Sequence, residues 1–213
     1  MSVTFEQARA FVSKFQEAIA ADKEYLTELD SAIGDGDHGM NMDRGMRAVL
    51  PKVEALPNGT VADLFRTVAM TLISTVGGAS GPLYGTLFLQ LGTNLKAKES
   101  VEPQDWSEAL TTAVAAVMSR GRAEPRDKTM VDALLPASQA LASGLAAGDE
   151  FDMALQAAEE AAHQGALDTI PMVAHRGRAS YLGDRSAGHQ DPGATSSWML
   201  MRAAREAFAT GSN

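Results

Sequence analysis

The chain has 213 residues, 45% of them apolar, with a net charge of −9 and no cysteine. This composition is ample for a hydrophobic core. The acidic balance argues against a nucleic-acid partner, because binding to nucleic acid rests on Lys and Arg contacts with phosphates. Without thiols there is no disulfide, thiolate metal site or cysteine nucleophile. Together with the lack of a signal-like leader, this favours a cytoplasmic protein. No uncharged apolar run is long enough to span a membrane, so we expect no membrane partner.

Apolar residues recur at helical spacing along most of the chain. Residues 4–7 have a capping-box pattern, which marks the start of a helix predicted over residues 5–19. A short segment and an acidic stretch follow, and then a second stripe covers residues 42–56. Both tryptophans lie on such stripes and are predicted to be core residues. The later predicted helices cover residues 60–73, 82–95, 103–117, 130–143, 151–174 and 194–208.

This pattern predicts an all-α, single-domain bundle or barrel of about eight antiparallel helices, comprising residues 1–213. Two connectors, residues 120–128 and 176–193, are too rich in charge and glycine to be simple turns. Their basic character suits either a phosphate ligand beside a metal or an ordinary solvated surface. The basic residues in them are Arg120, Arg122, Arg126, Lys128, Arg176, Arg178 and Arg185.

Three aspartates, Asp30, Asp35 and Asp37, lie close together with glycines between them. Carboxylates at this spacing repel one another, so they indicate either a solvated polar loop or a site for a hard cation. No strand precedes the Gly-x-Gly-x-x-Gly pattern at residues 34–39, which excludes a dinucleotide fold. The stretch also lacks the Gly and Glu of an EF-hand, and no Gly-Lys pair exists for a Walker P-loop. Among metal sites, the pattern favours Mg²⁺ with positions left for water and phosphate oxygens.

A second small-residue segment, residues 77–82, separates two predicted helices. Its backbone N–H groups and the Ser80 hydroxyl suit a phosphate at the start of the following helix, although a plain turn would have the same composition. His38 adjoins the aspartates. It is interpreted as a residue that orients a ligand through a hydrogen bond, with a phosphohistidine as the alternative.

Five segments in this order closely resemble motifs of the nucleotide-binding L subunits of dihydroxyacetone kinases. They are residues 34–42, 77–82, 127–130, 177–183 and 188–196. The resemblance covers nearly the whole chain. It implies an eight-helix antiparallel barrel that binds an adenine nucleotide and Mg²⁺ in loops at one end.

The resemblance also implies roles for single residues. Asp30, Asp35 and Asp37 match metal-binding aspartates. Arg178 matches a basic residue that faces the phosphates and stabilises their charge during catalysis. Arg126 stands where we expect glycine, which leaves the geometry of that turn open. The nucleotide contacts implied are His38, Gly39, Met40, Asn41, Ala79, Ser80, Gly121, Met130, Arg178, Asp191, Pro192 and Gly193.

Three aspartates and bound ADP carry a charge of about −6, which one Mg²⁺ reduces to about −4 and two to about −2. We therefore expect two Mg²⁺ ions. The resemblance implies a phosphotransferase subunit that passes a phosphoryl group to dihydroxyacetone on a separate K subunit. Its tightly bound ADP would be recharged by a phosphohistidine-bearing M subunit.

One alternative is a subunit with exchangeable ATP in an ATP-dependent kinase of dihydroxyacetone or a related triose or tetrose. A more distant alternative is a non-enzymatic helical bundle that binds a metal or an apolar ligand. The sequence leaves open whether the chain forms a homo-oligomer.

Overall fold

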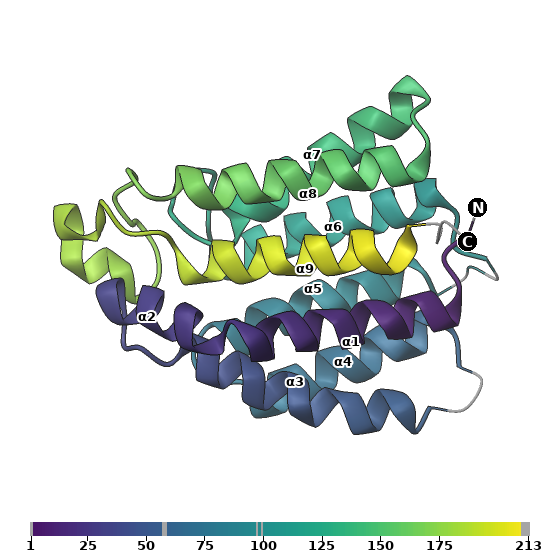
Figure 1. Ribbon diagram of the computed structural model, residues 1–213, viewed down its shortest axis with the longest axis horizontal. Helices are drawn as coiled ribbons and strands as arrows, with labels where there is room; N and C mark the ends of the chain where they lie inside the picture. The colour runs from purple at the N-terminus through teal and green to yellow at the C-terminus, as the bar shows by residue number, and fades with distance from the viewer. Residues whose placement is uncertain (1, 57–58, 97, 99, 210–213) are drawn as a thin grey trace.

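The computed structural model describes residues 2–56, 59–96, 98 and 100–209 (Figure 1). Within these ranges the chain has nine α-helices, one 3-10 helix and no strand, apart from an isolated bridge between Val3 and Val101. The prediction of an all-α fold is confirmed. The helices are α1 Phe5–Ala21, α2 Lys23–Ile33, α3 His38–Glu54, α4 Val61–Thr75, α5 Ser80–Asn94, α6 Pro103–Gly121, α7 Val131–Ala147, α8 Phe151–Asp168, the 3-10 helix η1 Arg178–Ser186, and α9 Pro192–Phe208.

Eight of the described α-helices form a closed ring. Each helix packs on the next in the order α1, α9, α8, α7, α6, α5, α4, α3, and α3 packs again on α1. Neighbours in the ring run antiparallel, and both chain termini lie at one end (Figure 1). Helix α2 lies outside the ring at the opposite end, where it contacts α3 and η1.

Local sequence signals account for several helix starts. At the start of α1, the Thr4 hydroxyl accepts the Gln7 N–H at 3.1 Å, and the Gln7 side chain accepts the Thr4 N–H at 3.0 Å. The start of α4 has the same reciprocal arrangement between Thr60 and Asp63. These capping boxes satisfy N–H groups that have no partner within the helix.

Two predicted boundaries are wrong, and one helix was not predicted. The short segment before Asp30 forms helix α2, which includes Asp30 and ends at Ile33, and α3 begins at His38, before the first apolar residue of its stripe. The helix expected to extend to residue 174 ends at Asp168. There the Thr169 hydroxyl donates to the Ala166 carbonyl at 2.6 Å and closes the last turn. The connector 176–193 contains η1 and so is partly helical.

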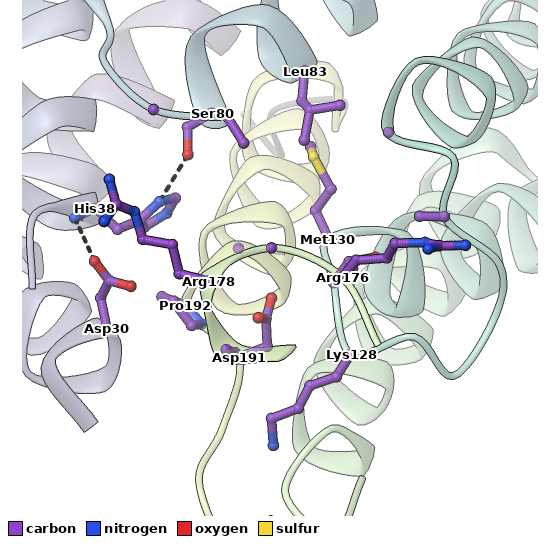
Figure 2. Close-up of a pocket in the computed structure, with 18 of the residues that line it drawn as sticks. Asp30, His38, Ser80, Leu83, Lys128, Met130, Arg176, Arg178, Asp191 and Pro192 are labelled. Carbon is purple, nitrogen blue, oxygen red and sulfur yellow. Dashed lines mark hydrogen bonds between the residues drawn. The ribbon is translucent and has the colours of Figure 1, made fainter. Parts of the chain in front are cut away.

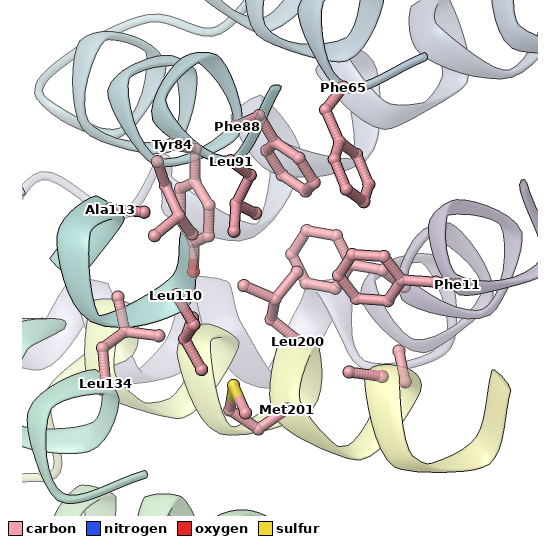
Figure 3. Packing of buried hydrophobic residues seen from close by; sticks show 14 of the residues in the cluster. Phe11, Phe65, Tyr84, Phe88, Leu91, Leu110, Ala113, Leu134, Leu200 and Met201 are labelled. Carbon is pink, nitrogen blue, oxygen red and sulfur yellow. The ribbon is translucent and has the colours of Figure 1, made fainter. Parts of the chain in front are cut away.

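The interior of the ring is a continuous apolar core drawn from all eight helices (Figure 3). Near the chain termini its aromatic rings meet edge to face: Phe11 and Phe65 lie 6.0 Å apart at 85°, and Trp106 and Phe208 lie 4.9 Å apart at 79°. The expectation for Trp106 is confirmed, whereas Trp198 is only half-buried and stacks on His163 at 4.3 Å. None of the described helices is both long and apolar enough to cross a membrane.

We predict that Gly165→Ala lowers the free energy of unfolding by about 1–3 kcal/mol, even though alanine favours helix. Gly165 lies where α8 meets α7, and an added Cβ would overlap the backbone carbonyl of Asp132. Urea unfolding followed by circular dichroism measures the change. The matched control is Gly144→Ala on α7, whose Cβ would stay at least 3.1 Å from its neighbours. Equal stability of the two variants would show that the helices separate without cost.

Candidate functional site

Four helices of the ring, α3, α5, α7 and α9, begin at the end opposite the chain termini. Their N-cap residues, Asp37, Ala79, Met130 and Asp191, all line one cavity of about 330 Å³ (Figure 2). Each helix N-terminus carries a partial positive charge and presents backbone N–H groups. The position of the cavity therefore favours an anionic ligand.

The walls of the cavity differ in chemistry. One side carries the three aspartates Asp30, Asp35 and Asp37, and the rim carries arginines at positions 120, 176 and 178. Such a cavity can hold a ligand that is charged at one end and apolar at the other. The apolar side chains of the wall include Ile33, Leu83, Val117, Ala123, Met130, Val131 and Pro192.

The aspartates converge. One carboxylate oxygen from each of Asp30, Asp35 and Asp37 lies within 4.8 Å of the other two. Asp30 is fixed by the backbone: its Oδ2 accepts the N–H of Asp37 at 2.8 Å and of His38 at 3.1 Å. The other two aspartates are exposed. A set of carboxylate oxygens with open sides fits a hard cation such as Mg²⁺.

Glycine shapes this acidic loop. A Cβ on Gly34 would overlap the Asp30 carboxylate, and Gly36 has a φ of +70°, which L-residues with a side chain rarely adopt. Asp30 lies on α2 but also caps α3, because its carboxylate accepts backbone N–H groups at the start of that helix. The Asp37 side chain makes no capping bond. The loop thus brings the metal candidates and the start of α3 together.

Arg178 pairs with the acidic cluster, its Nε lying 3.1 Å from Asp35 Oδ2. Its side chain is 68% exposed, so the pair is solvated and contributes little stability. The guanidinium can therefore exchange Asp35 for another anion in the cavity. Arg176 instead pairs with Asp127 at 3.3 Å, and Arg122 and Arg126 are exposed and do not line the cavity.

The start of α5 is open, in the sense that its backbone N–H groups have no side-chain cap among the described residues. Pro82 contributes no N–H. Gly78 has a φ of +65° with open space where a Cβ would be, while a Cβ on Gly81 would overlap the Val76 carbonyl. The turn is therefore tight on the α4 side and accessible on the cavity side.

His38 is buried behind this turn. Its Nδ1 lies 3.0 Å from Ser80 Oγ and its Nε2 lies 2.9 Å from Ser196 Oγ. Burial lowers the pKa of His38 to about 4, against the opposing effect of Asp30 and Asp37, so the ring is neutral near pH 7. With both ring nitrogens already bonded, the geometry favours an orienting role over a phosphohistidine.

Lys128 is the clearest departure from the sequence interpretation. Its residue is only 1% exposed, and its ammonium donates to the carbonyls of Thr169, at 2.7 Å, Met172, at 3.2 Å, and His189. The grouping of Lys128 with solvated or phosphate-facing basic residues is wrong. Its ammonium ties the connector before α7 to the two segments that flank η1.

The backbone at Arg126 has the conformation that glycine favours, in line with the expectation of glycine at that position. Its φ is +74°, in the left-handed region that glycine adopts without steric cost. The turn is held by Asp132, which accepts the N–H groups of Arg126 and Thr129. The glycine-type turn is therefore kept despite the arginine.

Asp191 caps α9 by accepting the Ala194 N–H at 2.7 Å. Burial raises the pKa of this carboxyl to about 7, with the Ala194 N–H and the nearby Lys128 opposing the shift. Asp191 is thus a buried group whose protonation changes near neutral pH in the ligand-free protein.

The cavity brings together most of the residues assigned from the resemblance. Of the fifteen, only Gly39, Met40 and Asn41 do not line it. Gly39 is buried against α2, and Met40 is 51% exposed. Asn41 accepts a hydrogen bond from Arg44 at 2.7 Å, behind Gly77.

Sequence reasoning missed much of the apolar wall. Leu83 and Tyr84 follow Ser80 by one helical turn, so the spacing from the small-residue turn was a usable signal. Val117 had no such signal, since it lies on a helix whose apolar stripe is otherwise core.

Comparisons with known proteins agree with this architecture. A family model described as the DAK2 domain matches residues 32–206. The ADP-binding subunit of the PEP-dependent dihydroxyacetone kinase of Escherichia coli (strain K12) is 41% identical over 202 residues, covering 95% of this chain and 96% of that protein. The ADP-binding subunit of the PTS-dependent dihydroxyacetone kinase of Lactococcus lactis is 40% identical over 97% of this chain and 100% of that protein.

A solved structure matches as well. The dihydroxyacetone kinase from C. freundii in complex with AMP-PNP and Mg²⁺ superposes with a TM-score of 0.73 and 29% identity over 97% of this chain. This chain spans 34% of that kinase, about a third of its length.

We predict that Arg126→Gly raises the free energy of unfolding by about 1 kcal/mol, because it removes the steric cost of a side chain at positive φ. Urea unfolding measures the change. Arg126→Ala is the matched control, since it removes the guanidinium but keeps the unfavourable φ and should leave stability nearly unchanged. If alanine stabilises as much as glycine, the arginine charge rather than the backbone is responsible.

We further predict that Asp191 makes the ligand-free protein less stable as the pH rises. Its folded pKa of about 7 lies above the ordinary value of 3.8. The stability that its protonated carboxyl contributes is therefore fully present below pH 3.8 and is lost as the pH rises through about 7. The slope reaches at most about 1.4 kcal/mol per pH unit. Asp191→Asn keeps a capping oxygen but cannot titrate. Between about pH 5 and about pH 8, urea midpoints should fall more steeply for the wild type than for Asp191→Asn. Parallel profiles of the two proteins would contradict the raised pKa of Asp191.

Proposed function

Because the chain belongs to the DAK2 domain family, we propose that it is the nucleotide-binding subunit of a dihydroxyacetone kinase. The observation that carries the proposal is the cavity at four helix N-termini, with a carboxylate cluster on one side and an apolar wall on the other. An adenine nucleotide with Mg²⁺ has matching chemistry, since it has anionic phosphates at one end and a flat apolar base at the other.

Asp30, Asp35 and Asp37 would hold the metal. Bound Mg²⁺ supplies charge neutralisation for phosphoryl transfer. Asp30 is preorganised by two backbone N–H groups, whereas the other two aspartates are exposed and keep oxygens free for ligation. The charge of three aspartates and ADP, about −6, supports two ions.

The open start of α5 would bind phosphate oxygens through its backbone N–H groups and the Ser80 hydroxyl. Arg178 would add its guanidinium when it leaves Asp35. A transferring phosphoryl group spreads negative charge over its oxygens, and a cation placed beside it stabilises the transition state. This is the catalytic role proposed for Arg178.

The apolar wall would take the adenine. Gly121, at the end of α6, leaves a slot beside Leu83, since an added Cβ would come to 3.4 Å from the Leu83 side chain. Met130 and Pro192 lie at the starts of α7 and α9 and border the same cavity. Gly39, Met40 and Asn41 would contribute through the backbone of α3 or by fixing the glycine turn.

We propose that the phosphoryl group passes to dihydroxyacetone on a separate K subunit, and that a phosphohistidine-bearing M subunit recharges bound ADP in place. The names of the Escherichia coli and Lactococcus lactis relatives, ADP-binding subunits of PEP- or PTS-dependent kinases, support this version. An exchangeable-ATP subunit remains the alternative. The cytoplasmic location, the choice among triose and tetrose acceptors and the oligomeric state stay predictions.

Native mass spectrometry of the purified protein tests the nucleotide proposal. We expect bound ADP with two Mg²⁺, retained through dialysis and released by a chelator. Phosphoryl transfer should then proceed with a phosphorylated M subunit and a K subunit carrying dihydroxyacetone. Turnover with free ATP, accompanied by rapid nucleotide exchange, would favour the alternative. Absence of nucleotide binding would favour the non-enzymatic bundle.

We predict that Asp35→Asn weakens ADP retention by at least about tenfold while helix content stays unchanged, because an amide oxygen is a poorer magnesium ligand than a carboxylate. Equilibrium dialysis and circular dichroism provide the two measurements. Glu28→Gln is the matched control, because it removes an exposed acidic charge from α2 away from the cavity. Equal losses in the two variants, or unfolding of Asp35→Asn alone, would show that Asp35 is not a ligand.

A further inference from the structure

A chain of buried polar groups runs from the cavity into the core. His38 on α3 lies between Ser80 on α5 and Ser196 on α9, at 3.0 Å and 2.9 Å. Behind it the Tyr84 hydroxyl lies 2.7 Å from Ser196 Oγ and 3.1 Å from Ser197 Oγ. The two α9 serines are fully buried and Tyr84 is 1% exposed, so solvent does not satisfy these groups.

One proton arrangement satisfies every contact along this chain, and a second gives up one contact but frees the Ser80 hydrogen for a ligand. In both, Ser197 donates to Tyr84 and Tyr84 donates to Ser196, which leaves Ser196 one hydrogen to place. In the inward arrangement Ser196 donates to the Gly193 carbonyl, at 3.1 Å. Ser196 then accepts the Nε2–H of His38, and Nδ1 accepts from Ser80, so only the lone pairs of Ser80 face the cavity.

In the outward arrangement Ser196 donates to His38 Nε2, and the ring proton sits on Nδ1 and is donated to Ser80. The Ser80 hydrogen is then free to point into the cavity. Without a ligand this arrangement makes one bond fewer, because the contact with Gly193 is lost. A phosphate oxygen accepting from Ser80 restores the count with a charge-assisted bond, which is roughly twice as strong as a neutral one.

We propose that Ser196 is a positioning residue that couples the tautomer of His38 to an anion at Ser80: Nε2–H in the ligand-free protein, and Nδ1–H with a phosphate bound. The inference rests on the proposed function, which places a phosphate at the start of α5. The number of protons is the same in both states. The ring proton leaves Nε2 and another reaches Nδ1 by exchange with water, while the Ser80 and Ser196 hydroxyls rotate.

Nitrogen-15 NMR of histidine-labelled protein tests the coupling, because the protonated and unprotonated ring nitrogens resonate far apart. We expect the two His38 nitrogens to exchange their chemical shifts when ADP and Mg²⁺ are added to chelator-stripped protein. Adenosine with Mg²⁺ lacks phosphate and should leave the ring in the Nε2–H form. An Nδ1–H ring in the stripped protein, or no change with ADP bound, would overturn the proposal.

The variants separate positioning from general stability. Ser196→Ala removes the bond to Gly193 that favours the inward arrangement, so the shift change on ADP binding should shrink or vanish. Ser197→Ala removes an equally buried hydroxyl one residue away that does not touch His38, and it should keep the full change. Equal responses of the two variants would refute the role of Ser196.

ADP binding is measured on the same samples by native mass spectrometry. Bound ADP with an unchanged tautomer defeats only this inference. Failure to bind ADP defeats the proposed function, and with it the anion that the inference requires.

Discussion

The antiparallel ring is the constraint on which the site depends. Because neighbouring helices alternate in direction, every second helix of the ring begins at the same end. Four N-termini therefore converge without any special loop design, and their partial charges have the same sign. A cavity there attracts anions by geometry alone. The three aspartates lie within this positive field, which offsets part of their mutual repulsion.

Carboxylates at this end fall into two groups. Asp30, Asp132 and Asp191 are largely committed to backbone N–H groups of the loops, and Lys128 performs the complementary task for backbone carbonyls. Loops that connect helix ends carry many unpaired backbone groups, and those that line a cavity cannot satisfy all of them with water. Asp35 and Asp37 are exposed by contrast, and this freedom makes them suitable for a metal.

Much of the fold could be predicted from sequence because its signals are local. The capping boxes at Thr4 and Thr60 and the apolar stripes identified most helices. The start of α3 could not be predicted in this way, since its cap comes from Asp30 on another helix. Lys128 was misread for a related reason: composition reveals a charge but not the carbonyls that surround it in the fold. The candidate metal residues were found because they are close in sequence. Val117 and Leu83 were missed because wall residues look like core residues until the ring closes.

The distribution of order around the cavity suggests how the proposed subunit divides its work. His38, Tyr84 and Ser196 are buried and fully bonded, so the side of the cavity against α5 and α9 is rigid. Asp35 and Arg178 are solvated and only weakly paired with each other, next to α2 and η1. A nucleotide bound along the rigid side would keep its position, while its terminal phosphate would meet groups that can change partners. Such an arrangement suits a bound coenzyme that exchanges a phosphoryl group with another chain, because only the exchanging end requires mobility.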